Sequence, residues 1–267
     1  ALCLSALTAC GGSTSSSDSS AAANTGDSDK VITVGATPTP HAEILNAAKD
    51  ALEAEGYTLK VVEFTDYVQP NTALVDGDLD ANYFQHTPYL NNFNKENGTD
   101  LAAAFDMHYE PFGIYAGKTA SIEELADGAS VAIPNDGSNE TRALLLLQDA
   151  GLIKLKDSAD FNPTIDDIET YNTKITIEEL KANVIPSTLA DVTAAVVNGN
   201  YALDFGLKTE DAIYKDDQLD IEEYWNLIAA RSADLEDADK LETYKKVVAA
   251  FQSDETEKVF NDQFGGY

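Results

Sequence analysis

Cysteine is almost missing from this sequence: the 267 residues contain only Cys3 and Cys10, both near the N-terminus. The chain after residue 10 therefore has no disulfide, no thiol nucleophile and no metal site built on cysteine. Apolar runs of 18 or more residues, the length that crosses a bilayer, do not occur. The motifs G-x-x-x-x-G-K-[ST], G-x-G-x-x-G, G-x-S-x-G and H-E-x-x-H are also missing. These absences argue against the common enzyme classes, and a hydrolase would need a nucleophile and a base that we do not find.

Basic residues are scarce as well. The chain has 17 Lys and Arg against 47 Asp and Glu, a formal net charge of -30. Such a surface repels nucleic acids and anionic lipid headgroups, so we expect no nucleic-acid partner. The acidity itself is typical of solvated faces that keep a protein soluble, and it identifies no partner.

The first 29 residues differ in composition from the rest. Residues 1–9 have the pattern of the end of a signal peptide, and Leu7-Thr8-Ala9-Cys10-Gly11 resembles a bacterial lipobox, in which the cysteine receives a lipid. Residues 11–29 are almost wholly small and polar, a composition that favours a flexible tether. We therefore predict that Cys10 is lipidated and that residues 10–29 hold a globular part near a membrane.

From residue 30 onward, short β-rich runs alternate with amphipathic segments, as expected for parallel sheets in an α/β fold. Gly56 is a suitable end for the first helix, and residues 121–124 have a capping-box pattern typical of a helix start. The predicted strands are 31–36, 59–64, 79–84, 101–115, 130–134, 192–197 and 227–230; the predicted helices are 38–56, 88–97, 139–150, 237–252 and 254–264.

Arg142 is one of only two arginines, and it lies in the first turn of the helix predicted to begin near Asn139. A guanidinium forms paired hydrogen bonds with a carboxylate, and free N–H groups at a helix N-terminus add to the attraction. The residue therefore qualifies as a binding site for the carboxylate of an amino acid. An ion pair with one of the many acidic side chains is an equally good interpretation.

Aromatic and histidine side chains gather near the predicted strand ends of the first half. Ligands of open α/β sheets bind at such ends, and aromatic rings can enclose a thioether; packing in the core is the alternative. The histidines would form a metal site only if the fold brought them together, and we expect no metal. The aromatic residues are Tyr67, Tyr83, Phe84, Tyr89, Tyr109 and Phe112; the histidines are His41, His86 and His108.

Several strings of sequence resemble the methionine-binding lipoproteins of ABC importers, the NlpA type. The longest are Glu63-Phe64-Thr65-Asp66-Tyr67-Val68-Gln69-Pro70-Asn71 and Asp76-Gly77-Asp78-Leu79-Asp80-Ala81-Asn82-Tyr83-Phe84-Gln85-His86. Others follow in the same order, among them Ala132-Ile133-Pro134-Asn135-Asp136 and Val197-Asn198-Gly199-Asn200-Tyr201-Ala202. The resemblance covers roughly residues 31 to 264.

This resemblance implies a two-domain, type II periplasmic-binding-protein-like fold with the ligand in the cleft. Domain one would comprise residues 30–115 and 226–267, and domain two residues 116–225. The expected ligand is L- or D-methionine or a methionyl dipeptide, delivered by a monomer to an ABC permease and its ATPase, without catalysis or a cofactor. The alternatives are a surface-tethered adhesion or signalling protein and a metal-binding transport protein.

The resemblance also assigns site residues. A thioether pocket would involve Tyr67, Phe84, His86 and Tyr89, with His108 nearby. Arg142 would pair with the ligand carboxylate, while Asn139, Asn198 and Asn200 would hydrogen-bond the backbone-like end of the ligand.

Overall fold

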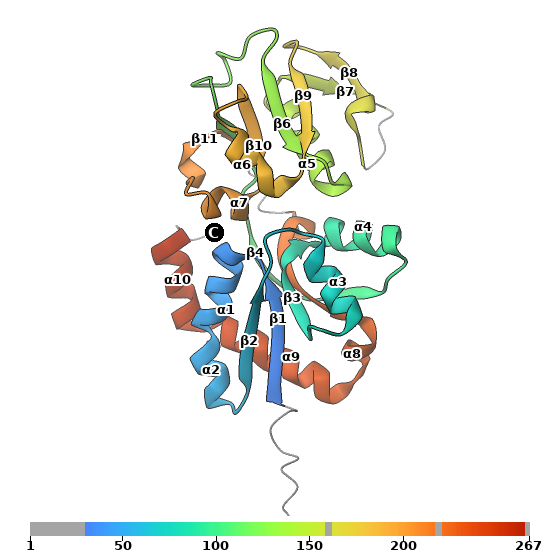
Figure 1. The fold of residues 1–267 in the computed structure, drawn as a ribbon, viewed down its shortest axis with the longest axis vertical. Helices are drawn as coiled ribbons and strands as arrows, with labels where there is room; N and C mark the ends of the chain where they lie inside the picture. The colour runs from blue at the N-terminus through green and yellow to red at the C-terminus, as the bar shows by residue number, and fades with distance from the viewer. Residues whose placement is uncertain (1–29, 158–161, 217–220, 265–267) are drawn as a thin grey trace, which may run out of the picture.

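Two lobes, each built on a five-stranded sheet, make up the computed structural model, which describes residues 30–157, 162–216 and 221–264 (Figure 1). Cys10, the predicted tether and the signal-peptide remnant lie outside these residues. Within the described ranges, no helix is both long and apolar enough to cross a membrane. The predicted α/β architecture with sheets flanked by helices is confirmed, and each five-stranded sheet is mixed, with parallel and antiparallel pairs.

The sheet of the first lobe has the order β2-β1-β3-β12-β4. Its strands β1, β2 and β3 are parallel, whereas β12 runs antiparallel to both β3 and β4. The apolar run 227–230 predicted a strand, and this strand, β12, follows the whole second lobe in sequence but pairs in the first sheet. The strands are β1 (Val31–Ala36), β2 (Thr58–Glu63), β3 (Ala81–His86), β4 (Leu101–Tyr109) and β12 (Trp225–Arg231).

Helices cover both faces of this sheet. The core on one side joins Val34 of β1 to Leu45 and to Val247, all buried. On the other side Leu74 and Leu90 pack against Leu227. The helices are η2 (Pro38–Ala42), α1 (Glu43–Ala47), α2 (Lys49–Ala54), α3 (Gln69–Asp76), α4 (Thr87–Asn97), α8 (Ser232–Glu236), α9 (Ala238–Phe251) and α10 (Asp254–Phe264).

The second lobe has a sheet of order β11-β5-β10-β6-β9 and a separate hairpin, β7-β8. The run of leucines in α5 is buried against Ile114 and Val131 of this sheet. The elements are β5 (Gly113–Ala116), β6 (Ser130–Pro134), α5 (Gly137–Asp149), β7 (Ile153–Leu155), η3 (Ile165–Asp167), β8 (Ile168–Tyr171), β9 (Thr176–Leu180), η4 (Ala182–Val184), α6 (Ile185–Thr188), β10 (Ala194–Val197), α7 (Gly199–Asp204), η5 (Thr209–Asp211) and β11 (Ala212–Lys215). A short helix, η6 (Glu222–Tyr224), lies at the end of the crossing back to the first lobe.

Two predicted helical features are wrong. The helix predicted over 38–56 is broken into η2, α1 and α2, and Thr39 is extended (φ -114°, ψ 131°) because a residue that precedes proline avoids the helical region. Residues 121–124 form bends and a turn; the Glu124 carboxylate accepts from the backbone N–H of Ala120 (3.3 Å) instead of capping a helix. The broken first helix places His41 in the interior, fully buried.

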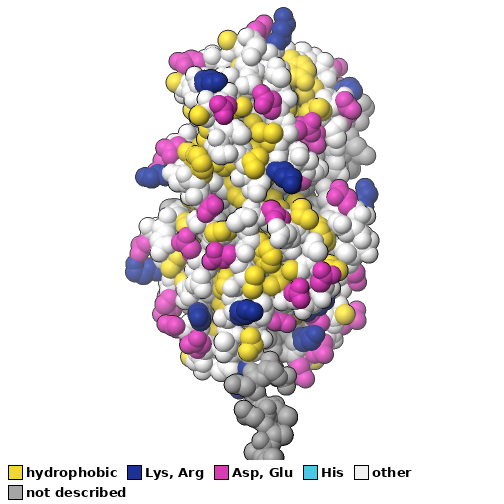
Figure 2. All heavy atoms as spheres, in the orientation of Figure 1, with side chains coloured by type: hydrophobic (Ala, Val, Ile, Leu, Met, Phe, Trp, Pro, Cys, Tyr) yellow, Lys and Arg dark blue, Asp and Glu magenta, His cyan; other side chains and the backbone are white. Residues whose placement is uncertain are grey.

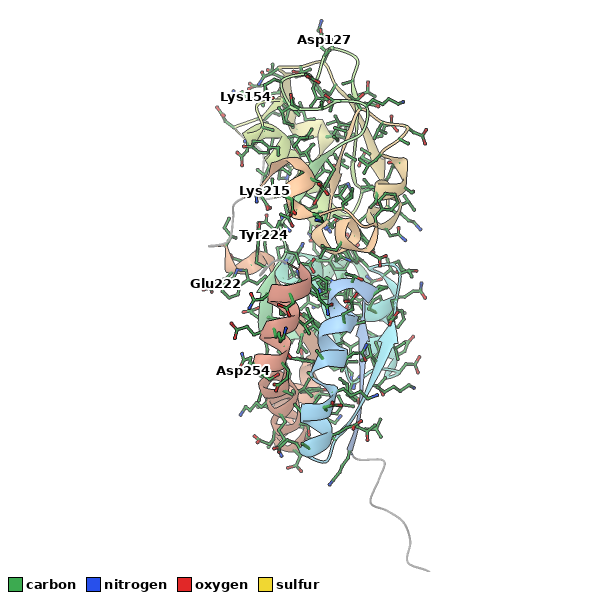
Figure 3. All side chains as sticks on the ribbon, turned by 90° about the vertical axis from the view of Figure 1, so that its left-hand side faces the viewer. Asp127, Lys154, Lys215, Glu222, Tyr224 and Asp254 are labelled. Carbon is green, nitrogen blue, oxygen red and sulfur yellow. The ribbon has the colours of Figure 1, made fainter. Side chains whose placement is uncertain are left out.

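Charged side chains are spread over the surface of both lobes on the face shown in Figure 2, with acidic groups scattered among them. The chain crosses between the lobes after β4 and again after β11. Tyr224 and Lys215, at the ends of the second crossing, lie at the level where the lobes meet (Figure 3). The surface between the lobes is therefore the place to look for a site.

Candidate functional site between the lobes

A cavity with about 20 Å³ of free volume lies at the junction of the two lobes. A space of this size holds roughly one water molecule, so the side chains of the two lobes pack closely around it. The first lobe contributes the C-terminal end of β3, the start of α4 and the start of β12, and the second lobe contributes the starts of α5 and α7. The lining residues are Tyr67, Phe84, Gln85, His86, Tyr89, Glu110, Asn139, Arg142, Asn198, Gly199 and Asn226.

Arg142 reaches the cavity from the second turn of α5 and is 4% exposed. Its Nε and Nη2 donate to Oδ2 of Asp216 at 2.9 and 2.7 Å, and Nη2 also donates to the carbonyl oxygen of Glu110 (3.2 Å). The guanidinium lies between the rings of Phe112 and Tyr224, each 4.7 Å away. The structure thus shows the ion pair that was one of the two sequence interpretations. Because the hydrogen bonds of the guanidinium to the described residues use Nε and Nη2, Nη1 remains for a ligand in the cavity that Arg142 lines.

The start of α5 is tied to both lobes through Asn139. Asp136 caps the helix: its carboxylate accepts from the backbone N–H of Asn139 (3.0 Å) and from Asn139 Nδ2 (2.9 and 3.0 Å). With its NH₂ group held in this way, Asn139 presents Oδ1 to two donors, Nδ2 of Asn198 (2.9 Å) and Nε2 of His86 (3.3 Å). One amide therefore joins the two lobes at the edge of the cavity.

His86 is the N-cap residue of α4. Its Nδ1 accepts from the backbone N–H of Tyr89 (3.3 Å), so the proton of the neutral ring lies on Nε2, which faces Asn139. Burial, together with the positive charge of Arg142, lowers the pKa of His86 to about 4. A second ring proton would point at the Tyr89 N–H, and His86 is therefore a neutral hydrogen-bonding residue at neutral pH.

Aromatic rings form one wall of the cavity. The centroids of Tyr67, Phe84 and Tyr89 lie 5.7 to 5.8 Å apart. Tyr67 also stacks on Tyr201 of α7 (4.7 Å) and donates to Oδ1 of Asn200 (2.5 Å), so the wall extends into the second lobe. Burial raises the pKa of Tyr67 far above its ordinary value, so its hydroxyl stays protonated. The wall can pack against an apolar or thioether side chain.

A buried cluster of three side chains, His41, His108 and Glu110, lies at the edge of the cavity. Oε1 of Glu110 is 3.1 Å from Nε2 of His108 and 3.4 Å from Nε2 of His41. The far nitrogens also have partners: Nδ1 of His41 is 2.7 Å from Oγ1 of Thr37, and Nδ1 of His108 is 2.5 Å from the hydroxyl of Tyr83. The three ligand atoms are close enough together to hold a metal ion.

Glu110 is ionised in this setting. Burial opposes ionisation, but the interactions with His41 and His108 and with the backbone N–H of Asn200 outweigh it, so the pKa of Glu110 lies below its ordinary value. Burial lowers the pKa of His41 to about 4, although the charge of Glu110 acts in the opposite direction. The arrangement is a buried carboxylate that receives a hydrogen bond from Nε2 of His108, with His41 beside it.

The structure brings most of the predicted site residues together. Asn200 and His108 do not line the cavity; they lie behind it, where Asn200 supports Tyr67 and His108 supports Glu110. The residues at the cavity are Tyr67, Phe84, His86, Tyr89, Asn139, Arg142 and Asn198.

Four lining residues were not predicted: Gln85, Glu110, Gly199 and Asn226. Gln85 and Gly199 lay within the strings that carried the family resemblance, next to predicted site residues. Glu110 lies inside the strand predicted over 101–115, which in the structure ends at Tyr109, and nothing in its local sequence separates it from the other acidic residues. Asn226 precedes the apolar run of β12, and its place in the site depends wholly on the return of that strand.

The sequence profile of the NlpA lipoprotein family matches residues 32–267. The D-methionine-binding lipoprotein MetQ of Escherichia coli K12 is 42% identical over 223 residues, 82% of this chain and 80% of that protein. A nutrient binding protein from Burkholderia cenocepacia, solved bound to methionine, has a TM-score of 0.82 at 44% identity and covers 88% of this chain and 97% of its own. The substrate binding protein of a methionine transporter from Streptococcus pneumoniae has a TM-score of 0.83 at 35% identity, covering 89% and 94%. The chain belongs to the NlpA lipoprotein family.

Proposed function

We propose that this protein is the solute-binding component of an ABC importer and that it captures methionine between its two lobes. The observation that carries the proposal is the cavity itself, which combines an aromatic wall with Arg142, the cation that would bind a carboxylate. An ABC permease with its ATPase would accept the ligand. Support for the choice of ligand comes from the relatives, whose names specify D-methionine or methionine.

In this proposal, the residues divide between the two ends of the ligand. Tyr67, Phe84 and Tyr89 would contact the thioether, because sulfur packs favourably against ring edges by roughly 0.3–1.5 kcal/mol per contact. Nη1 of Arg142 and the amide of Asn139 would serve the polar end. The ion pair with Asp216 would hold the guanidinium in place, so that little side-chain entropy is lost when the ligand binds.

The division into domains is part of the proposal. One body would comprise residue 30 to the end of β4 and the chain from β12 onward, and the other β5 to β11. The predicted bounds of 115 and 226 shift slightly, because β5 pairs with β10 and Trp225 begins β12. Ligand would exchange through a hinge motion about the two crossings. The contacts of His86 with Asn139 and of Tyr67 with Asn200, which join the two lobes, would hold the closed form. No catalytic step is required of any of these residues.

Calorimetric titration tests the proposed ligand. The protein lacking residues 1–10, freed of ligand by mild unfolding and refolding, is titrated with L-methionine, D-methionine, glycyl-methionine and alanine. Tight binding of a methionine compound and weak binding of alanine is the expected result. Phe84→Ala should weaken methionine binding more than alanine binding, because only methionine reaches the wall; equal losses would contradict the thioether assignment.

We also propose that the protein is anchored to the extracytoplasmic face of the membrane through a lipid on Cys10. The lipobox-like sequence supports this assignment, and relatives of this chain are named as lipoproteins. Mass spectrometry of the N-terminal peptide from the native host should show a diacylglyceryl group on Cys10. An unmodified cysteine would refute the anchor.

A further inference from the structure

We infer that Asp216 is a positioning residue: with Arg142 and Tyr109 it forms a buried clasp that joins the two crossings between the lobes, and the lobes open about this clasp as a pivot. The inference rests on the proposed exchange of ligand by a hinge motion and specifies where the hinge lies. Three observations carry it: the donors around one carboxylate, the position of the guanidinium between two rings, and the strand order of the two sheets.

The carboxylate of Asp216 connects the two crossings. Asp216 is 8% exposed and directly follows β11, where the second crossing begins. Its Oδ1 accepts hydrogen bonds from the hydroxyl of Tyr109, at the end of β4, and from the backbone N–H of Phe112 in the first crossing (3.0 Å). The backbone N–H of Asp216 donates in turn to the carbonyl oxygen of Phe112 (3.0 Å). The start of the second crossing is therefore fixed to the first crossing by side-chain and backbone hydrogen bonds.

The guanidinium of Arg142 completes the clasp. It is buried, its Nε and Nη2 donate to Oδ2 of Asp216 (2.9 and 2.7 Å), and Nη2 also donates to the hydroxyl of Tyr109 (3.2 Å). It lies between the ring of Phe112, in the first crossing, and the ring of Tyr224, at the end of the second. Separating a buried ion pair leaves a desolvated charge without its partner, which costs far more than breaking a neutral hydrogen bond. The clasp is thus the part of the junction that is hardest to separate.

Both crossings lie on the same side of the two sheets. The strand β4, which leads into the first crossing, is an edge strand of the first sheet, and β11, which leads into the second crossing, is an edge strand of the second sheet. Lys215 and Tyr224 mark the side of the crossings in Figure 3. The opposite edges are β2 and β9. There the lobes meet again, because Nδ2 of Asn183, after β9, donates to the carbonyl oxygen of Thr65, after β2 (3.1 Å).

The position of the pivot follows from what each opening motion would break. The lobes have to part for an amino acid to enter, since the free volume of the cavity is only about 20 Å³. A hinge rotation displaces atoms in proportion to their distance from its axis. An axis through the clasp keeps the ion pair intact and breaks neutral contacts on the far side, such as that of Asn183 with Thr65. An axis at the opposite edges would have to separate the clasp. Arg142 therefore keeps its place in the open and the closed form.

The test measures two distances between the lobes by electron paramagnetic resonance of spin labels. Cys3→Ser and Cys10→Ser remove the two native cysteines, so that only introduced cysteines carry labels. A far pair of labels spans the side of β2 and β9, and a near pair spans the crossings. The far pair is Glu63→Cys with Ser187→Cys and the near pair is Asp106→Cys with Lys215→Cys, all at exposed positions.

Methionine should shorten the far distance of the ligand-free protein by more than about 2 Å, the scale of hinge rearrangements, and change the near distance by less than about 1 Å. In Asp216→Asn and in Tyr109→Phe the near distance should change by more than about 2 Å, because the crossings are less firmly joined. The control Tyr244→Phe also removes a buried tyrosine hydroxyl, one that donates to the carbonyl oxygen of Asp80 within the first lobe (2.8 Å), and should behave as the wild type. Tyr109→Phe retains the ion pair, so it carries the test if urea unfolding shows that Asp216→Asn is not folded.

A near distance that changes as much as the far distance in the wild type would place the pivot elsewhere and overturn the inference. A near distance that stays fixed in the folded variants would do the same, as would a far distance that does not change although methionine binds. Calorimetry separates these results from the proposed function, which fails if methionine produces no heat. The ligand-free protein then decides the inference: a wide distribution of far distances with a narrow distribution of near distances would support the pivot, and equal widths would overturn it.

Discussion

The two buried histidines with lowered pKa values should make the protein sensitive to mild acid. Both are neutral in the folded state, where burial lowers the pKa from 6.5 to about 4 for His41 and for His86. As the pH falls, the two histidines become protonated in the unfolded chain before they do so in the folded protein. Their contribution to the free energy of unfolding is therefore complete above pH 6.5 and is lost as the pH falls from 6.5 towards 4. Each pKa unit corresponds to about 1.4 kcal/mol, which gives about 2 kcal/mol per histidine by pH 5.

Urea unfolding of the ligand-free protein at pH 7 and pH 5 measures this effect, and the single tryptophan, Trp225, provides the fluorescence signal. The variant His86→Asn retains an N-cap acceptor for α4 but does not titrate. Its loss of stability between the two pH values should be about 2 kcal/mol smaller than that of the wild type, and His41→Gln should show a similar reduction. Because the chain has only three histidines, a change in the pH dependence of stability in one variant can be assigned to the histidine that was substituted. An unchanged pH dependence in His86→Asn would refute the argument from burial.

Two further predictions concern the junction of the lobes. Arg142→Ala should destabilise the protein by about 3–5 kcal/mol in urea unfolding, because Asp216 is left buried and unpaired. The double variant Arg142→Met with Asp216→Leu should recover stability but not methionine binding. Recovery of both would contradict the proposal that Arg142 binds the carboxylate of the ligand. Gly199→Ala should lower the free energy of unfolding by about 1–3 kcal/mol and weaken methionine binding, because the added Cβ would lie 2.8 Å from the carbonyl oxygen of Pro111. A variant with wild-type stability and affinity would show that α7 can move away from Pro111.

Elements with strong local patterns could be predicted from the sequence. The apolar spacing of α5 and the short β-rich runs of β1 and β2 specify their structure without reference to the rest of the chain. The strands β7, β8, β9 and β11 were missed because they are three to five residues long and partly polar; β9, for example, exposes Glu178 and Glu179. The break at Thr39 did have a local signal, because Pro40 follows it. The helical spacing of the apolar residues after Pro40 favoured one continuous helix and outweighed that signal.

The site residues also fall into those that could be predicted from local sequence and those that could not. The aromatic wall and the start of α5 lie within single segments, so their residues could be recognised from local sequence and from the family resemblance. Glu110 could not, because its environment comes from His41 on η2, Asn200 on α7 and its own strand end. The partner of Arg142 was equally hidden: Asp216 is 74 residues away, and nothing in its local sequence distinguishes it from other acids.

The position of β12 has a consequence for how the chain is made. In the first sheet this strand separates β3 from β4, and β4 pairs with no other strand in the sheet order. During synthesis, β1 to β4 emerge long before residues 225–231, so the first lobe has an open gap until the second lobe has been completed. Contacts between residues so far apart in sequence form slowly, and unpaired strand edges are prone to aggregate. A nascent chain of this protein thus cannot complete its first sheet until residues 225–231 have emerged, so the first lobe stays incompletely folded for most of synthesis.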